Sequence, residues 1–140
     1  MIELVLPLEY TAFCQLHQED YLRYTHERVQ DAWMSRQVVK AVLGNLATIW
    51  PTVISSPRPA AVAWQLLDAL ISSALSQRTA PPAAQTADSM HRMLPPGQAD
   101  ALILRCQLHL SEQRAAELMG VEAPTVASQL LMAQRALGDR

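Results

Sequence analysis

The sequence has few aromatic residues, two cysteines and a single lysine. Aromatic residues make up 5% of the 140 residues, although 50% of the residues are hydrophobic, and alanine is abundant. Strands favour aromatic and β-branched residues whereas alanine favours helix, so this composition predicts helices rather than sheets. The length allows one domain or two small helical ones.

The sequence also lacks the patterns of an exported or membrane-spanning chain. No charged leader with an apolar run opens it, and the apolar stretch 60–75 is short and interrupted by Gln65 and Asp68. In such a chain two cysteines are expected to be reduced rather than bridged. We therefore expect a cytoplasmic, all-α protein that does not enter a membrane.

Excess positive charge is missing from every segment. The net charge is −2, with 11 basic and 13 acidic residues. Residues 1–50 hold four basic and six acidic groups, residues 51–97 three and two, and residues 98–140 four and five. Duplex binding depends largely on Lys and Arg that neutralise phosphates. This charge distribution disfavours tight binding to DNA.

Motifs of catalysis and cofactor binding are absent from the sequence. It has no nucleophile elbow, no Gly-rich phosphate loop and no paired-carboxylate arrangement, so we expect neither an enzyme nor a cofactor. Two Cys–His pairs, at Cys14 and His17 and at Cys106 and His109, each share one helix face. The pairs could complete a zinc site if their helices met, but the spacing fits known sites poorly. Two buried cysteines and two surface histidines are the favoured alternative.

Hydrophobic periodicity and helix-breaking residues predict the domain organisation. Helices are expected over residues 9–29, 33–50, 60–77 and 98–109, with the second ending before Pro51. Residues 1–78 would form one helical domain, 79–96 a Pro- and Ala-rich linker, and 97–140 a second helical domain. The expected core of the first domain contains Val38, Val39, Val42, Trp33, Trp50 and Trp64.

The last third of the chain has the spacing of a helix-turn-helix. Ser111 can cap a first helix, Gly120 can end it, and Pro124 fits the start of a second helix over residues 123–137. The apolar residues that would face inward are Ala115, Leu118, Met119, Val126, Leu130, Ala133 and Leu137. On spacing alone, a DNA-reading motif and an ordinary helical hairpin are equally good interpretations.

The last third of the chain resembles region 4 of bacterial sigma factors of the extracytoplasmic-function group. The resemblance covers residues 94–105, which open with Leu-Pro-Pro-Gly, and the motif that follows them. Gly120, Thr125 and Val126 match the turn and the start of that family's reading helix. The amino-terminal half is similar to region 2 of the same family at Phe13, Leu16, Tyr21, Leu22, Tyr24, Val29, Val38, Val39, Val42, Leu43, Trp50, Pro51 and residues 59–70. The resemblance implies a regulator of bacterial transcription.

The chain departs from this family where the family contacts DNA. Active relatives carry basic residues at the positions of Ala127, Gln129, Met132 and Gln134, whereas Arg135 is the only basic residue in the expected reading helix. The candidate DNA-reading or partner face consists of Thr125, Ala127, Ser128, Gln129, Leu131, Met132 and Arg135. Exposed Leu and Met on a helix more often mark a protein contact than a DNA contact, and packing against the first domain is the alternative.

The residues at the expected polymerase contact also differ from the family pattern. Gln37, Lys40 and Ala41 lie where relatives carry an acidic-and-glutamine motif that docks onto the RNA polymerase clamp. A lysine there changes the charge of a polar interface, at a cost of several kcal/mol when like charges meet. Between Arg58 and Arg78 the later helix has no Lys or Arg with which to hold single-stranded DNA.

These departures favour a sigma-like regulator with weakened DNA and polymerase contacts that acts through a protein partner. The partner would be an anti-sigma factor, a sigma factor or another transcription regulator. One alternative is a divergent but active sigma factor that binds promoter DNA and RNA polymerase core. A second alternative is a purely structural or dimerising helical protein.

Overall fold

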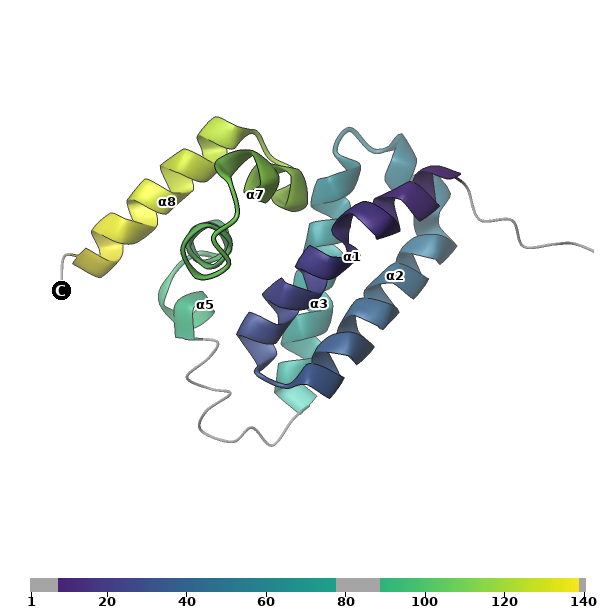
Figure 1. The fold of residues 1–140 in the computed structure, drawn as a ribbon, viewed down its shortest axis with the longest axis horizontal. Coiled ribbons are helices and arrows are strands. Elements are labelled where there is room, and N and C mark those ends of the chain that lie inside the picture. Colours follow the sequence, from purple (N-terminus) through teal and green to yellow (C-terminus); the bar gives the residue numbers. More distant parts are fainter. Residues whose placement is uncertain (1–7, 78–88, 139–140) are drawn as a thin grey trace, which may run out of the picture.

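The computed structural model describes residues 8–77 and 89–138, and every regular element in these ranges is a helix. The chain forms α1 (Leu8–Val29), α2 (Ala32–Ser55), α3 (Pro59–Gln77), α5 (Ser89–Met93), α6 (Pro96–Leu102), η1 (Ile103–Gln107), α7 (Glu112–Met119) and α8 (Ala123–Gly138). The expected all-α fold is confirmed. Figure 1 shows α1, α2 and α3 on one side, α8 at the far end, and α5 and α7 between them.

The first three helices pack along their apolar faces. Tyr21, Leu46 and Leu67 are fully buried members of one hydrophobic core. Trp64 is also buried, as expected, and so are Val38, Val39, Val42 and Trp50. Trp33 is the exception, because its side chain is 64% exposed and contributes nothing to the core.

Helix α2 continues through Pro51, whereas the sequence predicted that it would end before this residue. Proline lacks an N–H and normally costs about 3 kcal/mol inside a helix. Here Trp50 and Val53 are both buried, three residues apart on one face, so core packing offsets that cost and keeps the last turn helical.

Among the described residues, α2 is the helix long and apolar enough to span a membrane, a test that core helices of globular proteins also pass.

The two halves of the chain share one core. The cluster that contains the α1 and α3 side chains also includes Leu104, Leu118 and Val126 from the carboxyl-terminal half. A smaller cluster joins α6 to α8 through Leu94, Leu102 and Ala133. Residues 79–88 of the predicted linker lie outside the described residues, and α5 falls within the rest of it. The boundaries at 78 and 96 stay predictions.

The expected helix over residues 98–109 is formed only in part. It begins as α6 and then widens into the π-helical turn η1, in which the Leu108 N–H donates to the Ile103 carbonyl at 2.9 Å. The Arg105 guanidinium donates to the Leu110 carbonyl at 2.6 Å and so holds the end of this segment. His109 has a left-handed backbone, with φ of 58°, which turns the chain toward α7.

Candidate nucleic-acid and partner interface

Helices α7 and α8 form the helix-turn-helix that the sequence predicted. The Ser111 hydroxyl accepts a hydrogen bond from the Arg114 N–H at 3.0 Å and caps α7. Gly120 ends α7 with φ of 73°, the left-handed conformation that suits glycine. Helix α8 begins at Ala123 and buries Val126 and Ala133. The local signals for the cap, the turn and the inner face are all realised.

The outer face of α8 is exposed and mostly uncharged. Leu131 is 48% exposed and Met132 is 44% exposed. Thr125, Ala127, Ser128 and Arg135 are exposed as well. Arg135 is the one basic residue between Ala123 and Gly138, so this surface has little positive potential for a phosphate backbone.

Gln129 does not lie on this outer face, although the sequence placed it there. Its side chain is half-buried and covers Gly97, where an added Cβ would lie 3.3 Å from the Gln129 Cδ atom. The reason is the contact between α6 and α8, which brings the start of α6 beneath this turn of α8. Gln129 therefore contributes to internal packing and is less exposed than Leu131 and Met132 on the same helix.

Other cations of the carboxyl-terminal half are held within the protein. The Arg114 Nε donates to Asp20 at 2.7 Å, and its Nη2 donates to the Leu16 carbonyl at 2.6 Å. These contacts fix α7 to α1. As noted above, Arg105 binds the Leu110 carbonyl. Two arginines of the carboxyl-terminal half, Arg105 and Arg114, are thus occupied by protein groups.

The turn between α7 and α8 lies directly on the start of α3. A Cβ added to Gly120 would be 2.1 Å from the backbone nitrogen of Ala61, so no other residue fits there without moving α3. Arg58 donates to the Gly120 carbonyl at 3.3 Å and lies 3.8 Å from the Glu122 carboxylate. Glycine at this position meets two demands at once: a left-handed backbone and a close helix approach.

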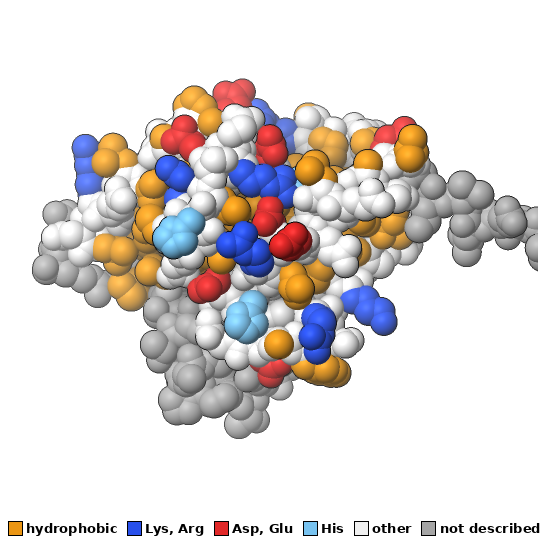
Figure 2. Space-filling view, viewed as in Figure 1, with side chains coloured by type: hydrophobic (Ala, Val, Ile, Leu, Met, Phe, Trp, Pro, Cys, Tyr) orange, Lys and Arg blue, Asp and Glu red, His pale blue; other side chains and the backbone are white. Residues whose placement is uncertain are grey.

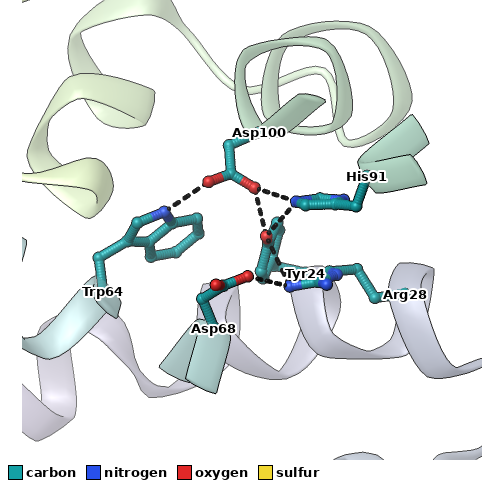
Figure 3. A network of polar contacts seen from close by, with 6 residues as sticks. All are labelled: Tyr24, Arg28, Trp64, Asp68, His91 and Asp100. Atoms are coloured by element: carbon teal, nitrogen blue, oxygen red, sulfur yellow. Dashed lines mark hydrogen bonds and ion pairs between the residues drawn. The ribbon is translucent and has the colours of Figure 1, made fainter. Parts of the chain in front are cut away.

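A buried polar network joins the two halves beneath the helix-turn-helix (Figure 3). The Asp100 side chain of α6 accepts hydrogen bonds from the Tyr24 hydroxyl of α1 and, at 2.9 Å, from the Trp64 Nε1–H of α3. The His91 Nε2 of α5 lies 2.8 Å from the same carboxylate. Asp100 is only 4% exposed. A buried carboxylate is tolerated only when paired, so four helices are held to one acidic side chain.

An ion pair extends this network along α1 and α3. The Arg28 Nη1 donates to Asp68 at 2.5 Å and lies 3.4 Å from the Tyr24 hydroxyl oxygen. Burial and the Asp100 carboxylate raise the pKa of Tyr24 well above its usual value, so the phenol stays protonated and donates. Sequence reasoning identified Trp64 as core but missed the network. The sequence feature that could have indicated the network is Asp100, a single acidic residue directly before the apolar residues 101–104.

His17 lies at the contact between α1 and α7. It is buried and stacks on Tyr21, with ring centroids 5.7 Å apart. Burial and the nearby Arg114 guanidinium lower the pKa of His17 to about 4, against the opposing effects of Glu117 and Asp20. The imidazole is therefore neutral at pH 7, and protonation would place a second positive charge beside Arg114.

The two Cys–His pairs are not assembled into a metal site. His17 is buried, Cys14 is half-buried, and Cys106 and His109 are exposed. Within residues 8–77 and 89–138, no three His, Cys, Asp or Glu side chains are grouped so as to hold a metal ion. The favoured alternative was also wrong in detail, because one histidine is buried and one cysteine is exposed.

The polymerase-contact-like residues form an exposed strip. Gln37, Lys40 and Ala41 all lie on the outer face of α2. Trp33, four residues before Gln37, adds an exposed ring to the same face instead of joining the core. This face carries the Lys40 cation and the exposed Trp33 ring where the resemblance to region 2 predicts an acidic-and-glutamine motif.

Residues 84–137 match the family model for sigma-70, region 4. The match covers the helix-turn-helix and the segments α5 to η1 that precede it. No curated protein sequence matches the chain. Sigma region 4 is a transcription-regulator domain rather than an enzyme family, and it implies RNA polymerase and promoter DNA as partners. The match supports a sigma-factor-like regulator of transcription.

Proposed function

We propose that this protein is a cytoplasmic, sigma-like regulator of bacterial transcription that has weakened DNA and polymerase contacts and acts through a protein partner. It would serve as a sigma mimic or adaptor of the extracytoplasmic-function type. The observation that carries this proposal is the outer face of α8, where Leu131 and Met132 are exposed and Arg135 is the one basic residue. Such a surface favours a protein over a polyanion.

The docking of α7 supports the same conclusion. Arg114 is bound to Asp20 and to the Leu16 carbonyl, so its charge is neutralised within the protein. Releasing it toward a phosphate would break a charge-assisted hydrogen bond that is only partly exposed. DNA binding through Arg114 would therefore cost the stability that these contacts provide.

The exposed strip on α2 supports weakened contact with polymerase. Lys40 makes no ion pair with any other residue within residues 8–77 and 89–138, so its charge faces any incoming partner. In relatives an acidic-and-glutamine motif occupies this place, and a cation there repels a surface that is built for acids.

One observation favours the second candidate, a divergent but active sigma factor. The outer face of α8 is not covered by α1, α2 or α3, and the exposed Thr125 and Ser128 hydroxyls could contact bases or phosphates. An anti-sigma factor, a sigma factor or another regulator remains the partner expected under the first candidate. A purely structural or dimerising role has no observation of its own in its favour.

The deciding experiment combines affinity capture with DNA binding. Tagged protein from its host would be analysed by mass spectrometry, and binding to promoter DNA would be titrated between 50 and 200 mM salt. We expect one regulatory protein and no salt-sensitive DNA binding. Recovery of RNA polymerase subunits, together with DNA affinity that falls steeply with salt, would establish the active sigma factor instead.

A charge-restored variant tests the α8 argument directly. Ala127→Lys, Leu131→Lys and Met132→Arg place three cations on exposed positions, avoiding Gln129 because it packs on Gly97. DNA affinity at low salt should rise by at least about a hundredfold. The matched control puts the same charge on α2 through Gln37→Lys, Ala41→Lys and Asn45→Lys, all exposed. Unmeasurable DNA binding by the restored variant would contradict a degenerate reading helix.

A further inference from the structure

A groove runs between α1 and α2, and its lining includes no residue of α3. It consists of two adjoining cavities of about 430 and about 460 Å³ that share Leu22 and Arg36 in their walls. The first extends to Gln107 at the end of η1 and to Leu108 after it, and the second extends toward Gly44 of α2. Along α2 the lining runs from Ala32 to Gly44, or about 18 Å at the helical rise, which matches three turns of a docked helix.

The floor of the groove is apolar. Leu22 and Leu43 are half-buried, and Val39 between them is buried against the core. These side chains belong to two helices that pack side by side, which is the arrangement that receives one apolar face of a third helix. A docked helix would remove the remaining exposed area of Leu22 and Leu43 from water.

The rim of the groove is positive. Arg23, Arg36 and Lys40 line it, with Glu27 as the one acidic residue in the lining. Arg23 is partly engaged, since its Nη1 lies 3.5 Å from Asp20 and its Nη2 donates to the Leu108 carbonyl. Arg36 and Lys40 form no ion pair within the described part of the chain. Figure 2 shows two basic side chains side by side over the amino-terminal half of α2.

We infer that this groove binds an acidic amphipathic helix of a protein partner. The apolar floor suits Leu-type side chains at positions i, i+4 and i+7, and the uncompensated cations suit Glu or Asp along the flank. The local positive charge lies on a chain whose net charge is −2, so it is a feature of this surface rather than of the composition. The inference rests on the proposed function only in requiring a protein partner, and it uses a surface separate from α8.

The test uses a defined probe. A fluorescein-labelled 14-residue peptide with Leu at i, i+4, i+7 and i+11 and Glu at most other positions is titrated with the full-length protein, and fluorescence anisotropy is measured at 50 mM salt. Saturable one-to-one binding is expected. The double variant Arg36→Glu, Lys40→Glu should weaken it at least about tenfold. The control Arg58→Glu, Arg92→Glu makes the same charge change at exposed residues that do not line the groove and should bind within about twofold of the wild type.

Two competitors separate the proposed occupant from other anions. A peptide with Lys in place of Glu should fail to displace the probe, and a 14-nucleotide single-stranded DNA should displace it at least about tenfold less well. Equal displacement by the DNA would make the rim a general polyanion surface and overturn the inference. So would absent binding, or equal loss in both double variants. None of these results alters the DNA or capture experiments on α8, so failure here and failure of the proposed function are distinguishable.

Discussion

The two helices of the helix-turn-helix are held in opposite ways. Helix α7 buries Ala115, Leu118 and Met119, binds α1 through Arg114, and packs on α3. Helix α8 buries Val126 and Ala133 along one side and leaves Leu131 and Met132 in water on the other. The difference shows that α7 and the turn attach the motif to α1 and α3, whereas α8 packs mainly on α6 and α7. The opposite side of α8 is exposed.

Removing the Asp100 carboxylate should have the largest effect on this arrangement. Asp100→Ala leaves the Tyr24 hydroxyl and the Trp64 Nε1–H buried without their acceptor, so the free energy of unfolding should fall by about 4 kcal/mol. Urea titration followed by circular dichroism measures this. Glu122→Ala is the control, because Glu122 is an exposed acid in a 3.8 Å pair and its loss should cost under about 0.5 kcal/mol. Equal stability of the two variants would show that the network does not anchor the motif.

A methyl group at Gly120 should be the next most damaging change. Gly120→Ala combines a left-handed backbone with a Cβ that would lie 2.1 Å from the Ala61 nitrogen. The backbone conformation alone costs about 1–2 kcal/mol, and displacing α3 raises the expected loss to about 3 kcal/mol. Gly138→Ala at the end of α8 meets nothing within 4 Å and should be neutral or slightly stabilising. Thermal unfolding of the two variants compares the docked turn with the free helix end.

These two sites also show what the sequence could and could not predict. Ser111 and Gly120 act through hydrogen bonds and backbone angles within a few residues, so spacing alone identified the cap and the turn. Asp100 acts through partners 76 and 36 positions away, Tyr24 and Trp64, and no local pattern indicates which residues the fold will bring together. The close approach of Gly120 to Ala61 could not be predicted from the sequence either, although the glycine itself was identified.

The misplaced Trp33 and Gln129 have physical reasons as well. The buried face of α2 passes through Ser35, Val38 and Val42, and Trp33 lies about 160° away from Ser35 around the helix. A large ring at the edge of an apolar segment was taken for core because of its type and not its register. Gln129 was assigned to the outer face because active relatives carry a basic residue at the matching position, whereas its contact with Gly97 depends on how α6 crosses α8.

Acidification should weaken the docking of α7 more than that of α8. The pKa of His17 is lowered to about 4 in the folded protein, from an ordinary value near 6.5, so the unfolded chain binds more protons in between. Stability from this residue is complete above pH 6.5 and is lost as the pH falls toward 4, by about 3 kcal/mol. Arg114, Glu117 and Asp20 face the same ring and set the balance. Urea titrations at pH 7 and pH 4.5 measure the difference.

The variant His17→Phe isolates the histidine from the carboxylates that also titrate in this range. It keeps a ring against Phe13 and Tyr21 and removes the proton. The free energy of unfolding of this variant should change less between pH 7 and pH 4.5 than that of the wild type. The difference between the two changes is the contribution of His17. An identical pH dependence in both proteins would mean that His17 is not the group that senses pH at the α1–α7 contact.

The smallest effect on stability is expected on the outer face of α8, and it tests the comparison most directly. Leu131→Ser with Met132→Ser removes side chains that are about half exposed, so the free energy of unfolding should change by under about 0.5 kcal/mol. Leu118→Ala on the buried face of α7 should cost about 3 kcal/mol in the same assay. The double serine variant should nevertheless lose capture of the partner protein. If it unfolds as readily as the Leu118 variant, the outer face of α8 is structural and the contrast between the two helices fails. If it stays stable and still captures the partner, α8 is not the surface through which the protein acts.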